Sequence, residues 1–260
     1  MNKKNIRLCV FDIDGTLKQK HVKIDIQTKK IIKKIQDKGI YCTVATGRGF
    51  LTTHHELNDL KLNAPLIISD GSCICDSKRK NLFFSSLENI EIERIENYIY
   101  RYHNEIKFIG FWDPNHTQLY AFIKPNRKDE FLESIPNIKI KIYRNIENLF
   151  ELAYRKHPSQ IAIITFNNPK PPIKSNAVHD NGNINFVNPG VSKKQAAFIL
   201  GTHLNISKNE IMVFAHDDDD LPIFDKNFGL NVALRTATSQ VKQKADIVLE
   251  NLDNIFKEIL

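Results

Sequence analysis

The chain has 260 residues, of which 42% are hydrophobic and 26% are charged, and its formal net charge is +7. This length and composition predict a globular protein with one large domain, or a core with a smaller inserted domain. The charge would suit nucleic acid or an anionic ligand, but the lysines are scattered and no nucleic-acid-binding motif accompanies them. We therefore expect no nucleic-acid partner.

Neither export nor membrane insertion is expected. Asp12 and Asp14 interrupt the apolar run that follows the basic start of the chain, which argues against a signal peptide. No stretch approaches the roughly 20 uncharged residues of a membrane helix. The four cysteines are too few and too irregularly spaced for a disulfide framework, and Cys73 and Cys75 lack the spacing of a metal clip. These features predict a cytoplasmic protein, and they leave its oligomeric state open.

Both ends of the chain alternate apolar, strand-like runs with amphipathic helices, a pattern typical of a parallel sheet covered by helices. In the first section the predicted strands are residues 7–13, 40–45 and 65–69, and the predicted helices are 25–38 and 50–60. In the last section the predicted strands are 211–215, 230–233 and 247–249, and the predicted helices are 193–204, 239–244 and 252–259. Residues 1–80 and 186–260 are therefore expected to form a doubly wound, Rossmann-like α/β core.

The middle of the chain, residues 81–185, has a different pattern. Its predicted strands are 107–111, 119–123, 138–143 and 160–166, and its predicted helices are 90–103 and 128–134. Longer loops with aromatic residues favour an antiparallel sheet with helices on one face, inserted into the parallel domain. Residues 167–183 are rich in Pro, Asn and Gly and predict a long loop or hinge.

Two carboxylates follow the first predicted strand. In VFDIDGTL, residues 10–17, Asp12 ends the strand, Asp14 lies two residues further on, and the chain turns at Gly15. Open parallel sheets bind their ligands at the carboxyl edge of their strands. A simple turn would account for the glycine, but it would not account for two acids directly after an apolar strand. A functional role for both acids is therefore favoured.

This segment resembles the first motif, DxDGTL, of the haloacid dehalogenase-like phosphatases. The resemblance implies that Asp12 attacks phosphorus to form an aspartyl-phosphate, and that Asp14 protonates the leaving oxygen and later activates water. Both roles are chemically reasonable. A carboxylate nucleophile divides a slow hydrolysis into two easier steps, and a second acid nearby supplies the proton transfers.

A phosphate-binding turn is predicted after the second strand. In VATGRG, residues 44–49, a threonine and a glycine precede a helix and offer a hydroxyl and backbone amides to an anion. The run resembles the second motif of the same family in its Cof-like form, which implies that Thr46 binds the transferring phosphoryl group beside Gly47. Arg48 either contacts the substrate phosphate or is a surface arginine at the start of the helix.

A lysine with a matching role is expected near residue 190. The segment VNPGVSKKQAA, residues 187–197, resembles the Cof-like signature around the third motif. The resemblance implies a catalytic Lys193, whose ammonium would lie against phosphate oxygens and balance the carboxylates, and an Asn188 able to reach the substrate. Lys194 stands where the pattern usually has glycine, so a slightly different helix start is expected.

The aspartate run FAHDDDDLPIF, residues 214–224, resembles the fourth motif of the family, GDxxND, with one departure. The apolar tail aligns Asp220 with the last acid and Asp219 with the asparagine. His216 then replaces the first aspartate. In the family that aspartate is a direct Mg²⁺ ligand, together with Asp12 and the backbone carbonyl of Asp14.

Three consequences of this replacement are open, since Mg²⁺ prefers oxygen donors whereas imidazole suits zinc, manganese, iron or nickel. A neighbouring acid takes the metal, or another divalent ion such as Mn²⁺ is preferred, or efficient catalysis is lost. The expected metal ligands are drawn from six residues: Asp12, Asp14, His216, Asp217, Asp219 and Asp220.

Together the motifs predict a metal-dependent phosphatase that hydrolyses a small phosphate monoester, for example a sugar phosphate. The insert resembles, in position and length, the α/β cap of the Cof-like class IIB branch. The alternative is a non-catalytic phosphate-binding or regulatory module, because His216 replaces a metal ligand. Asp70 stands where the family usually has asparagine, and it is either a turn residue or a residue that adjusts the entrance to the site.

Overall fold

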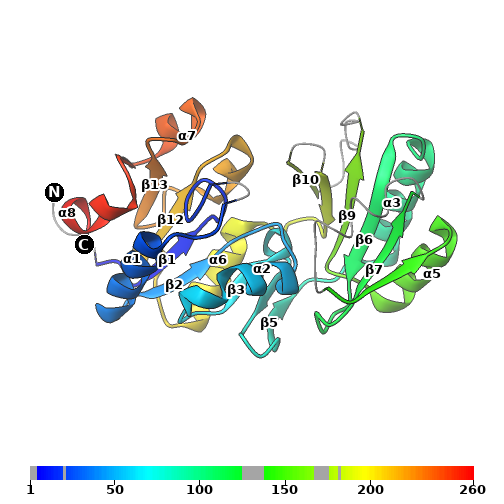
Figure 1. Cartoon of the computed structure of the whole chain (residues 1–260), viewed down its shortest axis with the longest axis horizontal. Helices are drawn as coiled ribbons and strands as arrows, with labels where there is room; N and C mark the ends of the chain where they lie inside the picture. The colour runs from blue at the N-terminus through cyan, green and yellow to red at the C-terminus, as the bar shows by residue number, and fades with distance from the viewer. Residues whose placement is uncertain (1–4, 20–21, 125–137, 167–175, 181–182) are drawn as a thin grey trace.

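The computed structural model describes residues 5–19, 22–124, 138–166, 176–180 and 183–260. Figure 1 shows two parts side by side: one contains both ends of the chain, and the other, drawn in green shades, is built from its middle. Among the described residues, no helix has the length and apolar character needed to cross a membrane.

The first part is built on a five-stranded sheet in the order β14-β13-β12-β1-β2, with all neighbours parallel. Its strands are β1 (Leu8–Phe11), β2 (Tyr41–Val44), β12 (Ile211–Ala215), β13 (Leu230–Leu234) and β14 (Ile247–Leu249). All but a few of their side chains are buried, as expected for a parallel sheet covered on both faces. A single parallel bridge, Ala45 to Ile67, leads from the end of β2 to β3 (Leu66–Ile68).

Helices lie on both faces of this sheet, which confirms the predicted doubly wound core. They are α1 (Ile26–Asp37), α2 (Phe50–Leu57), α6 (Lys193–His203), α7 (Ser239–Lys244) and α8 (Ile255–Glu258). The apolar stripe of α1 joins one core cluster, and the small residues of α6 join another. Asp25 caps α1 by accepting the backbone N–H of Thr28 at 2.6 Å. Short 3₁₀ turns complete the core: η1 (Asn58–Leu60), η2 (Ser69–Gly71), η4 (Lys208–Glu210), η5 (Asp218–Ile223) and η6 (Leu252–Asn254).

A small antiparallel sheet that the sequence patterns do not indicate lies beside the core, in the order β3-β4-β5. It comprises β3, β4 (Cys73–Cys75) and β5 (Asn81–Phe84). Since β5 pairs with β4, the expected boundary between residues 80 and 81 falls at the edge of a strand of this sheet. The expected domain boundaries remain a prediction.

The second part is an inserted α+β cap, as predicted. Its six-stranded sheet has the order β10-β11-β9-β6-β7-β8 and is antiparallel except for the parallel pair β7 and β8. The strands are β6 (Ile106–Trp112), β7 (Leu119–Ile123), β8 (Ile140–Tyr143), β9 (Gln160–Thr165), β10 (Asn176–Asp180) and β11 (Asn183–Val187). Helices α3 (Asn89–Arg101) and α5 (Ile146–Lys156) pack together and bury their apolar faces in one cluster with the sheet.

Three features of the cap differ from the sequence-based expectation: helix α5 and strand β11 were not predicted, and part of a predicted loop is a strand. Helix α5 was not predicted, although Asn145 caps it by accepting the N–H of Asn148 and it buries a stripe of apolar residues. The predicted loop over residues 167–183 is wrong at residues 176–180, because antiparallel pairing of β10 with β11 satisfies the backbone there despite the polar composition. The rest of that loop and the predicted helix 128–134 lie outside the described residues.

Candidate active site

Most of the predicted site residues come together at the carboxyl ends of three adjacent strands. Strand β1 lies between β2 and β12, and all three run parallel. Asp12 directly follows β1, Thr46 comes two residues after β2, and His216 directly follows β12. Lys193 is the first residue of α6, whose N-cap is the side chain of Ser192. This is the edge at which open parallel sheets bind their ligands.

A partly buried lysine lies between two buried carboxylates. The Nζ atom of Lys193 is 2.7 Å from Oδ1 of Asp220 and 3.6 Å from Oδ1 of Asp12. Burial by itself lowers the pKa of Lys193, but attraction to Asp220 and then to Asp12 raises it above its ordinary value. The lysine is therefore a fixed positive charge beside the predicted nucleophile.

Asp12 has a raised pKa, because the nearby lysine does not fully offset the effects that disfavour its ionised form. Burial is the largest influence and the nearby Asp220 carboxylate is the second, and together they raise the pKa of Asp12 to about 8. Lys193 lowers the pKa only in part. In the protein without a bound cation, much of the Asp12 population is therefore protonated near neutral pH.

Asp14 is held in its ionised form by two cations. Its carboxylate pairs with Nζ of Lys18 at 3.0 Å and with a guanidinium nitrogen of Arg48. Burial pushes the pKa of Asp14 upward, but the charges of Arg48 and Lys18 outweigh it and hold the pKa below its usual range. The pKa values of Asp12 and Asp14, the two acids of the first motif, are thus shifted in opposite directions.

The turn after β2 is tightly packed between core and cap. The backbone N–H of Arg48 donates to Oγ1 of Thr46 at 3.2 Å. A Cβ atom at Gly47 would lie 2.9 Å from the side chains of both Asn185 and Asp70, so a larger residue would displace one of them. The cap also holds this turn through Gln160, whose amide donates to the Gly47 carbonyl at 3.2 Å.

Asp70 connects the core to the cap, which the sequence did not reveal. It has a left-handed backbone with a φ of 55°, and its carboxylate accepts from Gln160 at 2.9 Å and from Asn185 at 2.8 Å. Burial raises the pKa of Asp70, an effect that Lys193 and these amides partly offset. The aspartate in place of the family asparagine was the available signal for Asp70, whereas no motif marks Gln160 or Asn185.

The four aspartates of residues 217–220 point in different directions. Asp220 faces Lys193, whereas Asp218 accepts from the side chains of Thr238 and Gln240 in the α7 region. Asp217 lies 3.0 Å from Nδ1 of His216, and Asp219 is exposed. The run is therefore neither wholly a metal site nor wholly a solvated turn.

His216 lies against the turn that carries the first two acids. A Cβ atom at Gly15 would come within 2.2 Å of the His216 ring, so the imidazole covers the glycine directly. Gly15 has a φ of +86°, a conformation that suits glycine. His216 is thus placed where the resemblance puts the missing aspartate, next to the backbone of the first motif.

Comparison with known proteins agrees with this geometry. A family model described as haloacid dehalogenase-like hydrolase matches residues 9–257. The chain belongs to this family. The prediction that the chain is a haloacid dehalogenase-like phosphatase is confirmed.

Individual relatives extend over almost the whole chain. The stress response protein YhaX of Bacillus subtilis is 27% identical over 95% of this chain and 89% of its own length. The 5-amino-6-(5-phospho-D-ribitylamino)uracil phosphatase YcsE of the same organism is also 27% identical, over 95% and 90%. Among solved structures, a sugar phosphatase of subclass IIB has the same fold with a TM-score of 0.75 and 20% identity, covering 95% of both chains.

Two positions of this haloacid dehalogenase-like hydrolase stand apart from the cluster. Asn188 donates to Oγ of Ser85 at 3.2 Å and to the carbonyl of Ser86 at 3.0 Å. These bonds connect the two chain segments that join the core to the cap. Its expected contact with substrate remains a prediction. Lys194 forms an ion pair with Asp225 at 3.5 Å on a more exposed surface, and α6 still begins at Lys193 despite the missing glycine.

The cluster fits a divalent cation. Four carboxylates, those of Asp12, Asp14, Asp70 and Asp220, face three cationic side chains, those of Lys18, Arg48 and Lys193. This leaves an excess of negative charge, and the Asp220 carboxylate adds to burial in raising the pKa of Asp12. Carboxylate oxygens are the donors that Mg²⁺ prefers, and the neighbouring imidazole of His216 adds a donor that Mn²⁺ also accepts.

Proposed function

We propose that this enzyme is a cytoplasmic, divalent-metal-dependent phosphatase that hydrolyses a small phosphate monoester through an aspartyl-phosphate on Asp12. The observation that carries the proposal is the contact of the partly buried Lys193 with the buried carboxylates of Asp220 and Asp12 at the sheet edge. Thr46 lies at the same edge, where its hydroxyl supplies a donor for a phosphoryl oxygen.

The two steps use the two acids of the first motif. A carboxylate oxygen of Asp12 forms a bond to phosphorus, and the bond from phosphorus to the ester oxygen breaks, with Asp14 giving its proton to the leaving oxygen. A water molecule then loses a proton to Asp14 and attacks phosphorus, which releases phosphate and restores the Asp12 carboxylate. Lys193 remains charged throughout and offsets the negative charge of the transferring group.

The protonation states at rest are the reverse of those that the first step needs. Asp12 must be ionised, yet its pKa is raised to about 8. The carboxylates of Asp12 and Asp220 and the backbone carbonyl of Asp14 would hold the cation, with His216 and Asp217 beside them. Such a cation would keep Asp12 ionised and neutralise charge on the phosphoryl oxygens.

Asp14 must be protonated, yet Arg48 and Lys18 hold its pKa down. A phosphoryl group carries more negative charge than one carboxylate, so it competes with Asp14 for the Arg48 guanidinium. Substrate binding would then release Asp14 from one of its two cations and raise its pKa. On this account Arg48 both binds the substrate and prepares the acid.

A sugar phosphate or a similar polar metabolite is the proposed substrate class. One relative is a phosphatase of 5-amino-6-(5-phospho-D-ribitylamino)uracil, and one structural neighbour is a sugar phosphatase. The cap also packs directly on the phosphate-binding turn, where the Gln160 amide donates to the Gly47 carbonyl and the Asn185 amide donates to Asp70.

The non-catalytic alternative has less support, because the cluster retains both acids of the first motif and the lysine. The phosphatase and the non-catalytic module are distinguished by assays of phosphate release. The substrates are an aryl phosphate and a panel of sugar phosphates, each measured with Mg²⁺, Mn²⁺, Co²⁺ or Zn²⁺. The proposal requires activity with at least one metal and its loss in Asp12→Asn. Absence of release with every metal and every ester would favour the binding module.

A further inference from the structure

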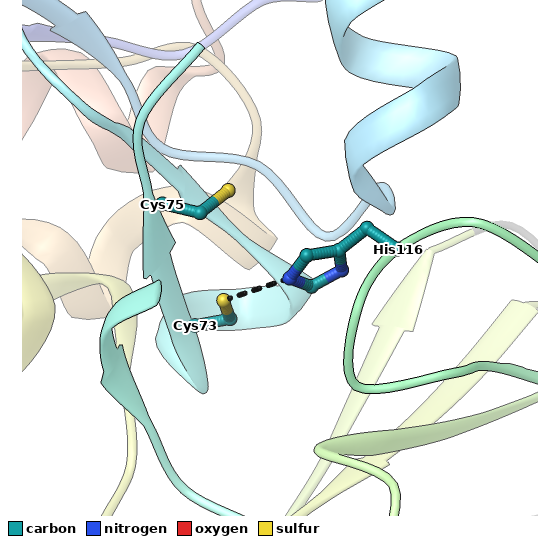
Figure 2. A group of neighbouring side chains, drawn as sticks. All are labelled: Cys73, Cys75 and His116. Atoms are coloured by element: carbon teal, nitrogen blue, oxygen red, sulfur yellow. Dashed lines mark hydrogen bonds between the residues drawn. The ribbon is translucent and has the colours of Figure 1, made fainter. Parts of the chain in front are cut away.

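A second cluster of metal-binding side chains lies where the cap meets the small sheet of the core (Figure 2). Cys73 and Cys75 belong to β4, and His116 belongs to the loop between β6 and β7 of the cap. One candidate ligand atom from each residue lies within 4.8 Å of the other two. The two thiols are fully buried, and His116 is 2% exposed.

Strand geometry explains why the two cysteines act together although they are only two residues apart. Successive side chains of a strand point to opposite faces, so residues 73 and 75 share one face. Both pack in one core cluster, whereas Ile74 between them packs in another. Cys73 and Cys75 lack the spacing of a local metal clip, because the third candidate ligand, His116, lies on a loop far along the chain.

The histidine ring is directed at the sulfur atoms. Its Nε2 atom lies 3.4 Å from Sγ of Cys73 and 2.8 Å from Oδ1 of Asn81. The amide nitrogen of Asn81 donates to the carbonyl of Pro114, which turns its oxygen toward the cluster, 3.3 Å from Sγ of Cys73. Burial lowers the pKa of His116, which favours the neutral ring that metals bind.

The separation between Cys73 and His116 is close to that of a tetrahedral zinc centre. With zinc bonds of about 2.3 Å to sulfur and 2.0–2.1 Å to nitrogen, a sulfur and a nitrogen ligand lie about 3.5 Å apart. The 3.4 Å between Cys73 and His116 matches this separation. The contact between His116 and Asn81, at 2.8 Å, would lengthen by about half an ångström if Asn81 became the fourth ligand.

The backbone conformation of the β6–β7 loop places the His116 ring at the cluster. His116 has a left-handed backbone with a φ of 56°, which is uncommon for a residue other than glycine. The carboxylate of Asp113 holds the loop by accepting the backbone N–H groups of Thr117 and Gln118, each at 2.6 Å. The His116 ring also contacts Phe50 at the start of α2, with 5.9 Å between ring centroids.

We propose that Cys73, Cys75 and His116, with Asn81 Oδ1 in the fourth position, bind one zinc ion that fastens the β6–β7 loop of the cap to β4 of the core. Zinc is the ion that thiolate and imidazole ligands in a tetrahedral arrangement favour. Binding releases the thiol protons, since the ligands are thiolates. This site is separate from the carboxylate cluster that is proposed to hold the catalytic cation.

The test is zinc binding by the full chain under reducing conditions, with excess Mg²⁺ present to occupy the carboxylate site. Zinc content is measured after dialysis, and Co²⁺ is then substituted as a spectroscopic probe. Thiolate-to-cobalt charge transfer identifies a cysteine site, because a site made of aspartate oxygens does not produce it. We expect one equivalent of zinc per chain, that charge-transfer band, and a zinc-dependent increase in the melting temperature.

Matched variants assign the ligands. Cys73→Ala, Cys75→Ala and His116→Asn should each lose the bound zinc, and asparagine is suited to the left-handed backbone at that position. Cys42→Ala removes an equally buried thiol from β2 and should keep the full equivalent. Melting curves without zinc show whether each variant is folded.

The wild-type protein is informative on its own if a ligand variant does not fold. Less than 0.1 equivalent of zinc in the wild type, roughly a tenfold shortfall, would overturn the proposal. So would a cobalt complex without the thiolate band, or equal loss of zinc in Cys42→Ala. Such results would mean that the three side chains form only a buried hydrogen-bonded cluster.

Discussion

The carboxylate cluster at the sheet edge and the cysteine–histidine cluster under the cap bring their side chains together in different ways. At the sheet edge, adjacent parallel strands place Asp12, Thr46 and His216 side by side, so the topology alone assembles the site. Under the cap, one strand supplies Cys73 and Cys75, and a loop some 40 residues further along the chain supplies His116. The first cluster is rich in charge, whereas the second is buried among apolar residues.

This difference decides which cation each cluster suits. Burial and then the neighbouring Asp220 carboxylate raise the pKa of Asp12, and a cluster of carboxylate oxygens suits a hard divalent ion. Thiol and neutral imidazole side chains suit a softer metal ion such as zinc. Experiments that separate the two clusters therefore test the whole account, and the largest effects are expected at the sheet edge.

Asp12→Asn should have the largest effect on activity. It removes the nucleophile but keeps the size of the side chain, so phosphate release should fall by about 10³-fold or more. The melting curve should show a folded protein, since no apolar contact is lost. Residual activity within tenfold of the wild type would mean that another group attacks phosphorus.

Lys193→Ala should reduce both activity and stability. It leaves Asp12 and Asp220 facing each other without their shared cation, and breaking such a buried pair costs about 3–5 kcal/mol. Urea denaturation and phosphate release measure the two effects. Lys194→Ala is the matched control, because its partner Asp225 lies on a more exposed surface, and it should change stability by less than about 1 kcal/mol. Equal effects of the two variants would contradict the role of Lys193 beside the buried carboxylates.

Gly15→Ala should be destabilising because two penalties combine. The residue has a φ of +86°, and the added methyl would meet the His216 ring at 2.2 Å. We expect a loss of about 2 kcal/mol or more in the free energy of unfolding. Gly39→Ala carries a similar φ of +79° in open space and should cost only about 1 kcal/mol. If the two losses were the same, His216 would not be packed on the first motif.

His216→Asp should make the sheet edge a better site for Mg²⁺. It supplies an oxygen ligand in place of imidazole, and the Mg²⁺ concentration for half-maximal phosphate release should fall by about tenfold. Asp218→Asn is the control from the same aspartate run, because Asp218 is bonded to Thr238 and Gln240. An unchanged Mg²⁺ requirement in His216→Asp would remove His216 from the cation site.

The last expected effect is a pH-dependent change in stability without metal. In the folded protein the pKa of Asp12 is raised to about 8, so between about pH 4 and pH 8 the folded state binds more protons at this group than the unfolded state. The contribution of Asp12 to stability therefore falls as the pH rises through this window. Because asparagine does not titrate, the melting temperature of Asp12→Asn relative to the wild type should rise from about pH 5 to about pH 8. A difference that is constant with pH would mean that the Asp12 pKa is not raised.

The sheet-edge cluster and the cysteine–histidine cluster also differ in how far they could be predicted from the sequence. Apolar runs and amphipathic helix patterns located the parallel core, because a strand buried on both faces leaves a continuous apolar signal. Motifs next to strand ends then located Asp12, Asp14, Thr46 and Lys193, since topology places strand ends together. These parts depend on patterns that are local in the chain.

Contacts between the two parts could not be predicted in this way. Gln160 and Asn185 reach Asp70 from the cap, and His116 reaches β4, only because the cap packs against the core. No local pattern marks such residues. Helix α5, in contrast, had a visible cap at Asn145 and an apolar stripe, so its omission was avoidable.

Chemical trapping of the phosphorylated enzyme tests the central claim most directly. The enzyme is quenched within its first turnover with metal and an active phosphate ester, treated with borohydride, which reduces an acyl-phosphate to an alcohol, and digested for mass spectrometry. The account predicts homoserine at position 12 in the peptide that contains residues 10–17, and its absence without the ester. An unmodified Asp12, or reduction of a different acid such as Asp14 or Asp220, would contradict it.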